Sequence, residues 1–173
     1  MKKVLQITYT AVLIALLVLL QAVTKAGGQL LTGSCVNAVL AIAAVLFGAW
    51  NGVAVALVSP FLAFILGVGP QIVPVVPIIA IGNVIYVLIL HFLSSKKNFA
   101  PWRQATGLLC AAICKFLALY LGVVKLLCAI LSLPEKQVAT LSTMFSWPQL
   151  LTALIGGSVA LWMIPVLRKA LRR

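Results

Sequence analysis

The chain has 173 residues, of which 64% are hydrophobic and only 8% are charged. Soluble domains carry about 25% charged residues, so this composition excludes an ordinary soluble domain and indicates a protein whose solvent is lipid. The net charge of +12 does not indicate a nucleic-acid-binding protein, because the lysines and arginines lie mainly at the ends of apolar segments, without interleaved aromatic residues.

The apolar segments predict the architecture. A helix needs about 20 apolar residues to cross a bilayer, and the hydrophobic runs predict six such helices in one membrane domain covering residues 1–173. The predicted fold class is therefore an all-α integral membrane protein, a bundle of six transmembrane helices. The expected spans are residues 4–23, 33–49, 53–66, 74–93, 106–131 and 147–167.

Positive charge is concentrated at the N-terminus, in the fourth connection and at the C-terminus. Six spans put these three places on one side of the membrane, and the positive-inside rule makes that side the cytoplasm. We therefore expect a multi-pass protein of the cytoplasmic membrane with both termini in the cytoplasm. The residues concerned are Lys2, Lys3, Lys96, Lys97, Arg103, Arg168, Lys169, Arg172 and Arg173.

Three connections would then face outward, at residues 24–32, 67–73 and 132–146. They are polar and rich in glycine or proline, which predicts loops of the kind that carry binding groups and gates. Ser146 and Gln149 have the spacing of a capping box, which predicts that the last helix begins near Trp147.

The polar residues exclude most catalytic chemistry. The sequence has one acid, Glu135 in a predicted loop, and one histidine, His91, with no Gly-rich phosphate loop. We therefore expect no enzyme, no ATP hydrolysis by this chain, no cofactor and no coupling through an intramembrane acid. The four cysteines have no histidine or carboxylate nearby, so we expect small buried apolar residues rather than metal ligands.

Lys115 is the most informative polar residue. It lies about nine residues into the fifth span, too deep to reach the cytoplasmic interface easily, so it must face protein or water. Helical projection places it over a stripe of small residues, with Lys125 at the edge of the same face. Two interpretations stay open: both lysines line a substrate cavity open to the outside, or the stripe is a close helix contact and the lysines bond carbonyls or the aqueous boundary.

Asn83 lies at a similar depth in the fourth span, with Tyr86 one turn further in. A buried asparagine needs several hydrogen-bond partners, which a ligand or the neighbouring helices can supply. Gln149 serves either the predicted cap or a ligand, and Trp147 either stacks on a flat ligand or anchors the helix at the interface. Further polar residues of the outer half are Gln21, Gln29, Asn37, Gln71 and Thr152, of which the last three are also candidate substrate-binding residues.

The first span carries a different signal. Ala11 and Ala15 form a small-xxx-small pair, which lets another helix approach closely. This pair either packs inside the bundle or forms a docking face for another subunit.

Three segments together resemble a known family. They are the alanine pair in residues 10–16, the Gly82-Asn83 step that follows Pro77, and the opening of the last helix at residues 149–156. With the size, the span count and the inside termini, the chain is similar to the substrate-binding S components of energy-coupling factor (ECF) transporters, membrane subunits that capture vitamins.

The resemblance implies partners and a mechanism. In this family the S component binds its substrate on the outer side, and its first helix docks onto a membrane T component. Two ATPases bound to the T component drive reorientation of the S component, which delivers the substrate inward, so ATP is used by the partners. Ala11 and Ala15 would be the docking pair. The pocket candidates by position are Asn83, Lys115, Gln149 and Thr152.

The expected cargo is a vitamin or related small water-soluble compound. The spans hold no acids, which argues against a cationic substrate such as thiamine, and the lysines favour a carboxylate or another acceptor-rich group. Two other classes remain open: a structural membrane protein of the cell-shape MreD type, which needs no pocket, and a solitary secondary transporter.

Overall fold

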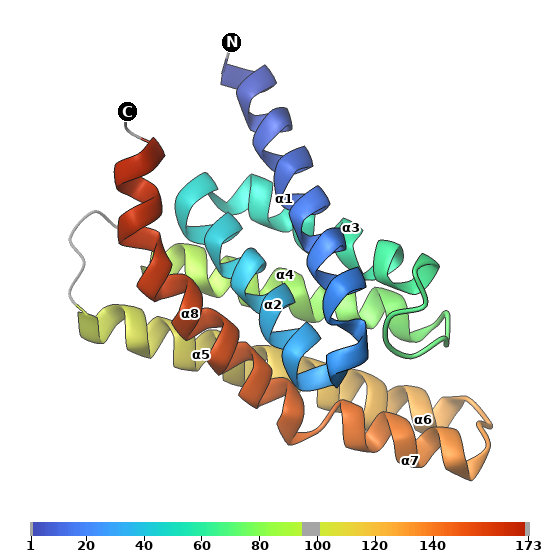
Figure 1. The fold of residues 1–173 in the computed structure, drawn as a ribbon. Helices are drawn as coiled ribbons and strands as arrows, with labels where there is room; N and C mark the ends of the chain where they lie inside the picture. Colours follow the sequence, from blue (N-terminus) through green and yellow to red (C-terminus); the bar gives the residue numbers. More distant parts are fainter. Residues whose placement is uncertain (1, 95–100, 172–173) are drawn as a thin grey trace.

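The computed structural model describes residues 2–94 and 101–171, without the side chains of residues 2, 3 and 101, and every regular element in these ranges is helical (Figure 1). The side chains of Lys2, Lys3, Lys96, Lys97, Arg172 and Arg173 lie outside this description. The elements in chain order are α1 (Lys2–Thr24), η1 (Lys25–Gly27), α2 (Gly28–Ile42), η2 (Ala43–Phe47), α3 (Ala49–Ile65), α4 (Val75–Ser94), α5 (Pro101–Leu119), η3 (Tyr120–Leu127), α6 (Cys128–Ile130), α7 (Glu135–Met144) and α8 (Trp147–Leu171).

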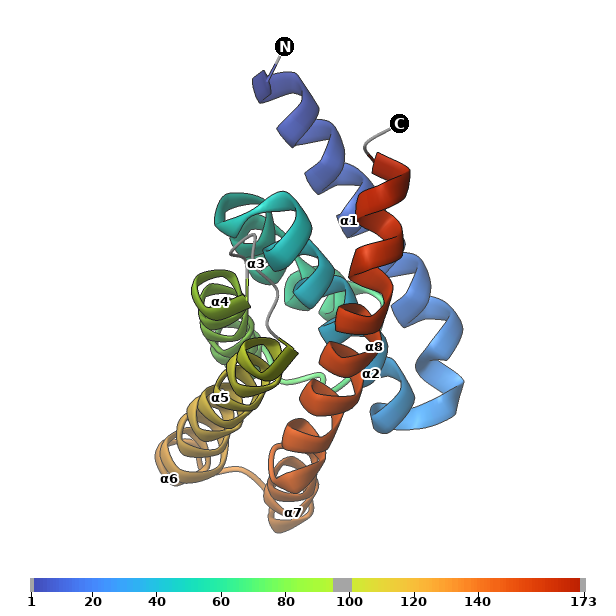
Figure 2. The ribbon, with the colours of Figure 1, turned by 90° about the vertical axis from the view of Figure 1, so that its left-hand side faces the viewer.

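The long helices form a closed ring. α1 packs against α3, α3 against α4, α4 against α5, α5 against α8, α8 against α2, and α2 against α1. Helices α1 and α5 therefore lie across the ring from each other, and α2 also touches α4 across it. Both termini lie at the same end of the bundle, and Figure 2 shows the same relationship after a quarter turn.

Helices α1 and α3 run parallel. The hydroxyl of Thr10 lies 3.0 Å from Oδ1 of Asn51, and Nζ of Lys25 donates to the carbonyl oxygen of Leu66 across 3.3 Å. Both contacts join residues that are 41 positions apart, so the two helices keep one register along their whole length.

Two breaks in the chain show how the sequence ends helices. Gly48 adopts a φ of 92°, a conformation that glycine enters without steric cost, and separates η2 from α3. Between α3 and α4 the chain passes through Gly67 and Gly69, also at positive φ, and then Pro70. These residues prevent a continuous helix and leave a short loop at the end of the bundle away from the termini.

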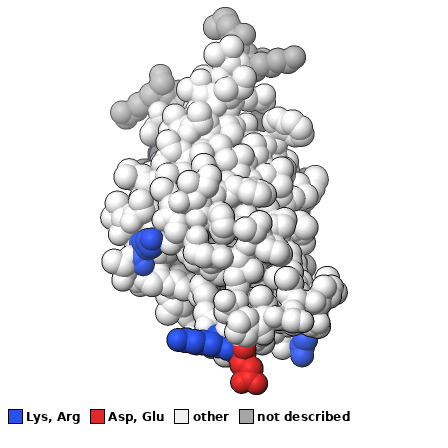
Figure 3. All heavy atoms as spheres, turned by 90° about the vertical axis from the view of Figure 1, so that its right-hand side faces the viewer, with Lys and Arg blue, Asp and Glu red and all other residues white. Residues whose placement is uncertain are grey.

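The interior is apolar and the outside is apolar too. Leu17, Leu40, Val55 and Leu90 are fully buried in the main core. Large apolar side chains such as Ile7, Ile65, Phe92 and Trp162 are mostly exposed, a pattern that suits contact with lipid. Figure 3 shows a face with few charged side chains, which lie in its lower half.

Four helical stretches are long and apolar enough to cross a membrane: Val4–Phe47, Val75–Ser94, Trp102–Ile130 and Glu135–Leu171. The first contains both α1 and α2, which run in opposite directions (Figure 1). Helix α3 is apolar but shorter, with 17 residues. The structure thus gives four candidate spans and one shorter apolar helix, and the predicted count of six spans is not confirmed.

The start of α8 at Trp147 confirms the sequence prediction, but the predicted capping box is wrong. The hydroxyl of Ser146 donates backward to the carbonyl oxygen of Thr143, and Nε2 of Gln149 donates to that of Met144. Both side chains turn toward the preceding helix, because α7 ends only two residues earlier and leaves its own carbonyl groups to be satisfied.

Other expectations also need correction. Residues 135–144, predicted as part of a loop, form α7, which begins after Pro134 with Glu135 in its first turn, a favourable charge at a helix N-terminus. Helix α2 begins at Gly28 rather than at residue 33. Cys110 and Cys114 are exposed on the outside of α5 rather than buried, which an apolar thiol tolerates against lipid.

Candidate functional site

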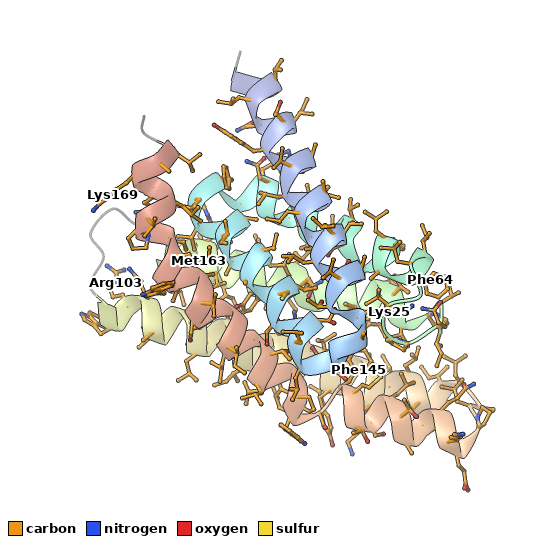
Figure 4. All side chains as sticks on the ribbon, viewed as in Figure 1. Lys25, Phe64, Arg103, Phe145, Met163 and Lys169 are labelled. Carbon is orange, nitrogen blue, oxygen red and sulfur yellow. The ribbon has the colours of Figure 1, made fainter. Side chains whose placement is uncertain are left out.

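A cavity of about 210 Å³ opens in the half of the bundle away from both termini. Its wall comes from the C-terminal parts of α1, α3 and α5 and the N-terminal parts of α2, α4 and α8. In Figure 4 Lys25, Phe64 and Phe145, which line it, lie at this end, whereas Arg103 and Lys169 lie nearer the termini. Small-molecule pockets measure about 300–1,000 Å³, so this cavity suits a small compound.

Lys115 enters the cavity from α5. Its side chain is 3% exposed, and Nζ donates to Oδ1 of Asn37 across 2.6 Å and to Oδ1 of Asn83 across 2.7 Å. Nζ also lies 5.3 Å from the ring centroid of Tyr86. The lysine thus joins α5 to α2 and α4 through side-chain oxygens, rather than through the backbone carbonyls considered from the sequence.

A second layer of hydrogen bonds orients these partners. Nδ2 of Asn37 donates to Oγ1 of Thr152 across 3.3 Å, and the Thr152 hydroxyl donates to the carbonyl oxygen of Gln149 across 3.1 Å. Because the amide nitrogen of Asn37 is directed at α8, its oxygen faces Lys115. The hydroxyl of Tyr86 donates to the carbonyl oxygen of Ala153 across 2.9 Å, which holds the ring beneath the lysine.

Glycine brings α2 and α8 close enough for this network. A Cβ at position 156 would collide with the carbonyl oxygen of Ser34, and one at position 33 would lie 3.0–3.1 Å from the side-chain carbons of Thr152. The absence of side chains at Gly156 and Gly33 thus allows the backbones to approach, which is the usual function of small residues between membrane helices.

The two titratable side chains at the cavity wall are both basic. The only acid in the sequence, Glu135, lies at the start of α7 and does not line it, whereas Lys115 and Lys25 do. Burying a cation without an opposite charge costs free energy, and the two asparagine oxygens offset part of that cost. An ammonium has three N–H donors, so one donor of Lys115 remains for a ligand acceptor.

Two further polar atoms at the cavity wall have no hydrogen-bond partner in the described part of the chain. They are Oε1 of Gln21 on α1 and Oγ of Ser59 on α3, whose side chains are 4% and 1% exposed. Such orphaned buried atoms are uncommon in native proteins and call for a ligand, an ion or water. Sequence reasoning noted Gln21 only as an outer-half polar residue and missed Ser59, since a single serine in an apolar helix carries no distinctive signal.

The mouth of the cavity is bounded by the connections. Nε2 of Gln29 and Nε2 of Gln149 both donate to the carbonyl oxygen of Met144 at the end of α7. Across the opening, Lys25 bonds the Leu66 carbonyl oxygen, and residues 68–70 of the next loop line the cavity. On each side of the mouth, a side chain thus donates a hydrogen bond to a backbone carbonyl oxygen at the end of a neighbouring helix.

The structure brings some of the sequence-derived candidates together and separates others. Among the described residues, Lys115, Asn83, Asn37 and Gln149 line the cavity. Thr152 accepts a hydrogen bond from Asn37, and the ring of Tyr86 lies beneath Lys115, but neither residue is part of the lining. The candidates that do not line it are Gln71, Trp147 and Lys125.

Lys125 is displaced by a change in helix type. It lies on the π-helical segment η3, is exposed, and its Nζ sits 5.7 Å from the ring centroid of Tyr120. The projection that put it on the face of Lys115 assumed about 100° per residue, but a π-helix turns less per residue. The error accumulates over residues 120–125 and rotates Lys125 away from the cavity.

A second depression lies near the termini, between α1 and α3. This groove of about 510 Å³ is lined by Gln6, Ile7, Thr10, Ala11, Ile14, Trp50, Asn51 and Ala54. Ala11 and Ala15 are both exposed, so the alanine pair does not serve packing inside the bundle. Trp50 is 80% exposed beside it.

Comparison with known families decides the identity. The family model described as ECF transporter, substrate-specific component, matches residues 5–168. The chain belongs to this family. Neither the curated proteins nor the solved structures give a match.

As an ECF substrate-specific component, the chain is a transport protein, and its apolar helices make it a multi-pass membrane protein. This agrees with the resemblance seen in the sequence and disfavours the structural-protein alternative. The cavity around Lys115 is then the candidate substrate site.

Proposed function

We propose that this chain is the S component of an ECF-type importer, which captures a vitamin or related small water-soluble compound on the outer side of the cytoplasmic membrane. The observation that carries the proposal is the buried Lys115 at the cavity wall, held by Asn37 and Asn83 without an acid. A purely structural bundle gains nothing from a buried lone cation, whereas a binding protein gains an anchor for its ligand.

The orientation follows from charge and termini. Both termini lie at one end of the bundle and the cavity at the other, so termini in the cytoplasm put the cavity on the outer side. Six spans with α3 as the shortest are compatible with this arrangement, since a short apolar helix is accommodated by local thinning of the bilayer.

The partners are a T component and two ATPases, because this chain carries no phosphate loop of its own. The groove beside Ala11 supports docking of the T component: it has the small side chains of Ala11 and Ala54 in its wall and lies at the cytoplasmic end of α1 in this orientation. The chain needs no cofactor in this mechanism, and ATP is consumed by the partner subunits.

The test is to purify the chain alone, extract it under denaturing conditions and identify released compounds by mass spectrometry. A panel of water-soluble vitamins is then screened for thermal stabilisation, since a ligand that binds only the folded state raises the unfolding midpoint. We expect one compound to be released and the same compound to stabilise the protein. If no compound is released and none stabilises the chain, the proposal fails.

A further inference from the structure

The unsatisfied polar atoms and Lys115 lie on opposite sides of the cavity. Gln21 belongs to α1 and Ser59 to the adjacent α3, whereas Lys115 belongs to α5, which faces α1 across the ring. All three side chains line the same cavity and all are at least nine-tenths buried. The cavity therefore has two polar poles.

The two poles differ in chemistry. The Lys115 pole has a positive charge, no acid to neutralise it, and one N–H donor left after its bonds to the two asparagines, so it suits an anionic acceptor. The opposite pole presents Oε1 of Gln21, an acceptor without a donor, and, from the adjacent helix, the hydroxyl of Ser59, which both donates and accepts. It suits an N–H or O–H group.

Much of the remaining wall is apolar. Val36, Pro60, Phe64 and Ile79 contribute to it. A ligand that is polar throughout would lose hydrogen bonds to water against this wall, so the middle of the ligand is a hydrocarbon or aromatic unit. The cavity volume of about 210 Å³ restricts that unit to a small one.

We propose that the ligand is a small carboxylate with a hydrogen-bond donor at its far end. Its carboxylate binds Lys115 and Asn83, and its donor is received by Gln21 Oε1 and Ser59 Oγ. This inference rests on the proposed function and specifies the substrate class of that site. Lys25, at the mouth, adds a second positive charge on the entry path of an anion.

The experiment uses matched probes on the purified full chain in nanodiscs, with binding measured by saturation-transfer NMR and titration. 3-Aminobenzoate and 4-aminobenzoate carry both groups, benzoate carries the acid alone, and 4-aminobenzamide carries the donor without the charge. We expect an aminobenzoate to bind about tenfold tighter than benzoate and than the amide, one hydrogen bond or charge contact being worth about that factor. Equal or tighter binding of the amide, or no binding by any probe, overturns the inference.

Variants assign the poles. Gln21→Leu and Ser59→Ala should each weaken the aminobenzoate about tenfold and leave benzoate unchanged, since only the donor contact is lost. Gln137→Leu and Ser158→Ala are matched controls at exposed positions outside the cavity lining, and should change neither probe. If the first two variants weaken both probes equally or neither, the donor pole is overturned.

This outcome is separable from failure of the proposed function. If the compound released from the purified protein is neutral or cationic, the importer proposal stands and the carboxylate inference is overturned. If no compound is released and no vitamin stabilises the chain, the proposed function itself fails.

Discussion

Oδ1 of Asn37 accepts a hydrogen bond from Nζ of Lys115 across 2.6 Å, although the two residues are 78 positions apart in the sequence. The contact joins α2 to α5, and the bond from Asn37 to Thr152 extends it to α8. With the bond from Lys115 to Asn83 on α4, four helices around the candidate substrate site set the geometry at the lysine.

Lys115→Met should weaken binding of the released compound about a hundredfold, because it removes a charged hydrogen-bond donor from a site without any other buried cation. Calorimetric titration of the purified protein measures the change. Lys125→Met is the matched control, because this lysine is exposed on η3 and does not line the cavity. The affinity of this variant for the released compound should stay at the wild-type value. Equal losses in both variants would contradict the site described here.

Asn37→Asp keeps the shape of the side chain but adds a carboxylate next to Lys115. The new carboxylate pairs with the ammonium and competes with the acceptor of the substrate, so affinity should fall about tenfold or more. Titration with the released compound measures it. An unchanged affinity would mean that the lysine does not contact the substrate.

Thr152→Val removes a hydroxyl at nearly constant volume. Nδ2 of Asn37 then loses its acceptor on α8, which frees the amide to rotate and should weaken substrate binding about tenfold. Thr140→Val on α7 is the control, since that exposed hydroxyl bonds only the carbonyl oxygen of Lys136. The idea of an orienting second layer is refuted if both variants bind substrate like the wild type.

Gly156→Ala should lower the thermal unfolding midpoint, because the added Cβ meets backbone atoms of α2 that cannot move aside. Overpacking of this kind costs about 1–3 kcal/mol. Gly27→Ala is the comparison: its Cβ would meet the end of the exposed Leu31 side chain, which can change rotamer. Similar midpoints for the two variants would show that the α2–α8 contact is less tight than described.

Ala11→Leu should abolish uptake in cells that also produce the T component and the ATPases, while binding by the purified chain stays intact. The residue is exposed at the groove, so added bulk blocks a partner without disturbing the interior. Ala139→Leu, exposed on α7 away from the groove, is the control and should support normal uptake. Binding lost in parallel with uptake would assign Ala11 to packing instead.

Much of the fold follows from local signals in the sequence. Long apolar runs predict the helices, and the spacing of Ser146 and Gln149 predicts the start of α8 at Trp147, although the two side chains do not form the cap. Helix α7 was not predicted, because a polar ten-residue segment has no apolar periodicity. The helix is instead stabilised by packing of Leu141 against its neighbours in the second core cluster.

The candidate site was predictable only where depth alone identifies a residue. Lys115 and Asn83 stand out because a charge or amide at mid-membrane needs a reason. Gln21 and Ser59 do not, since their significance arises from convergence of α1 and α3 on one cavity, which no local pattern encodes. The prediction that Lys125 shares the cavity face is wrong because the π-helical turn rotates this residue away, and periodicity cannot anticipate such an irregularity.

The constant register between α1 and α3 places the groove and the cavity at the two ends of one helix pair. Thr10 with Asn51 borders the groove near the termini, and Gln21 and Ser59 border the cavity on the same two helices. A partner docked in the groove would therefore touch the same two helices that present Gln21 and Ser59 to the cavity at their other end.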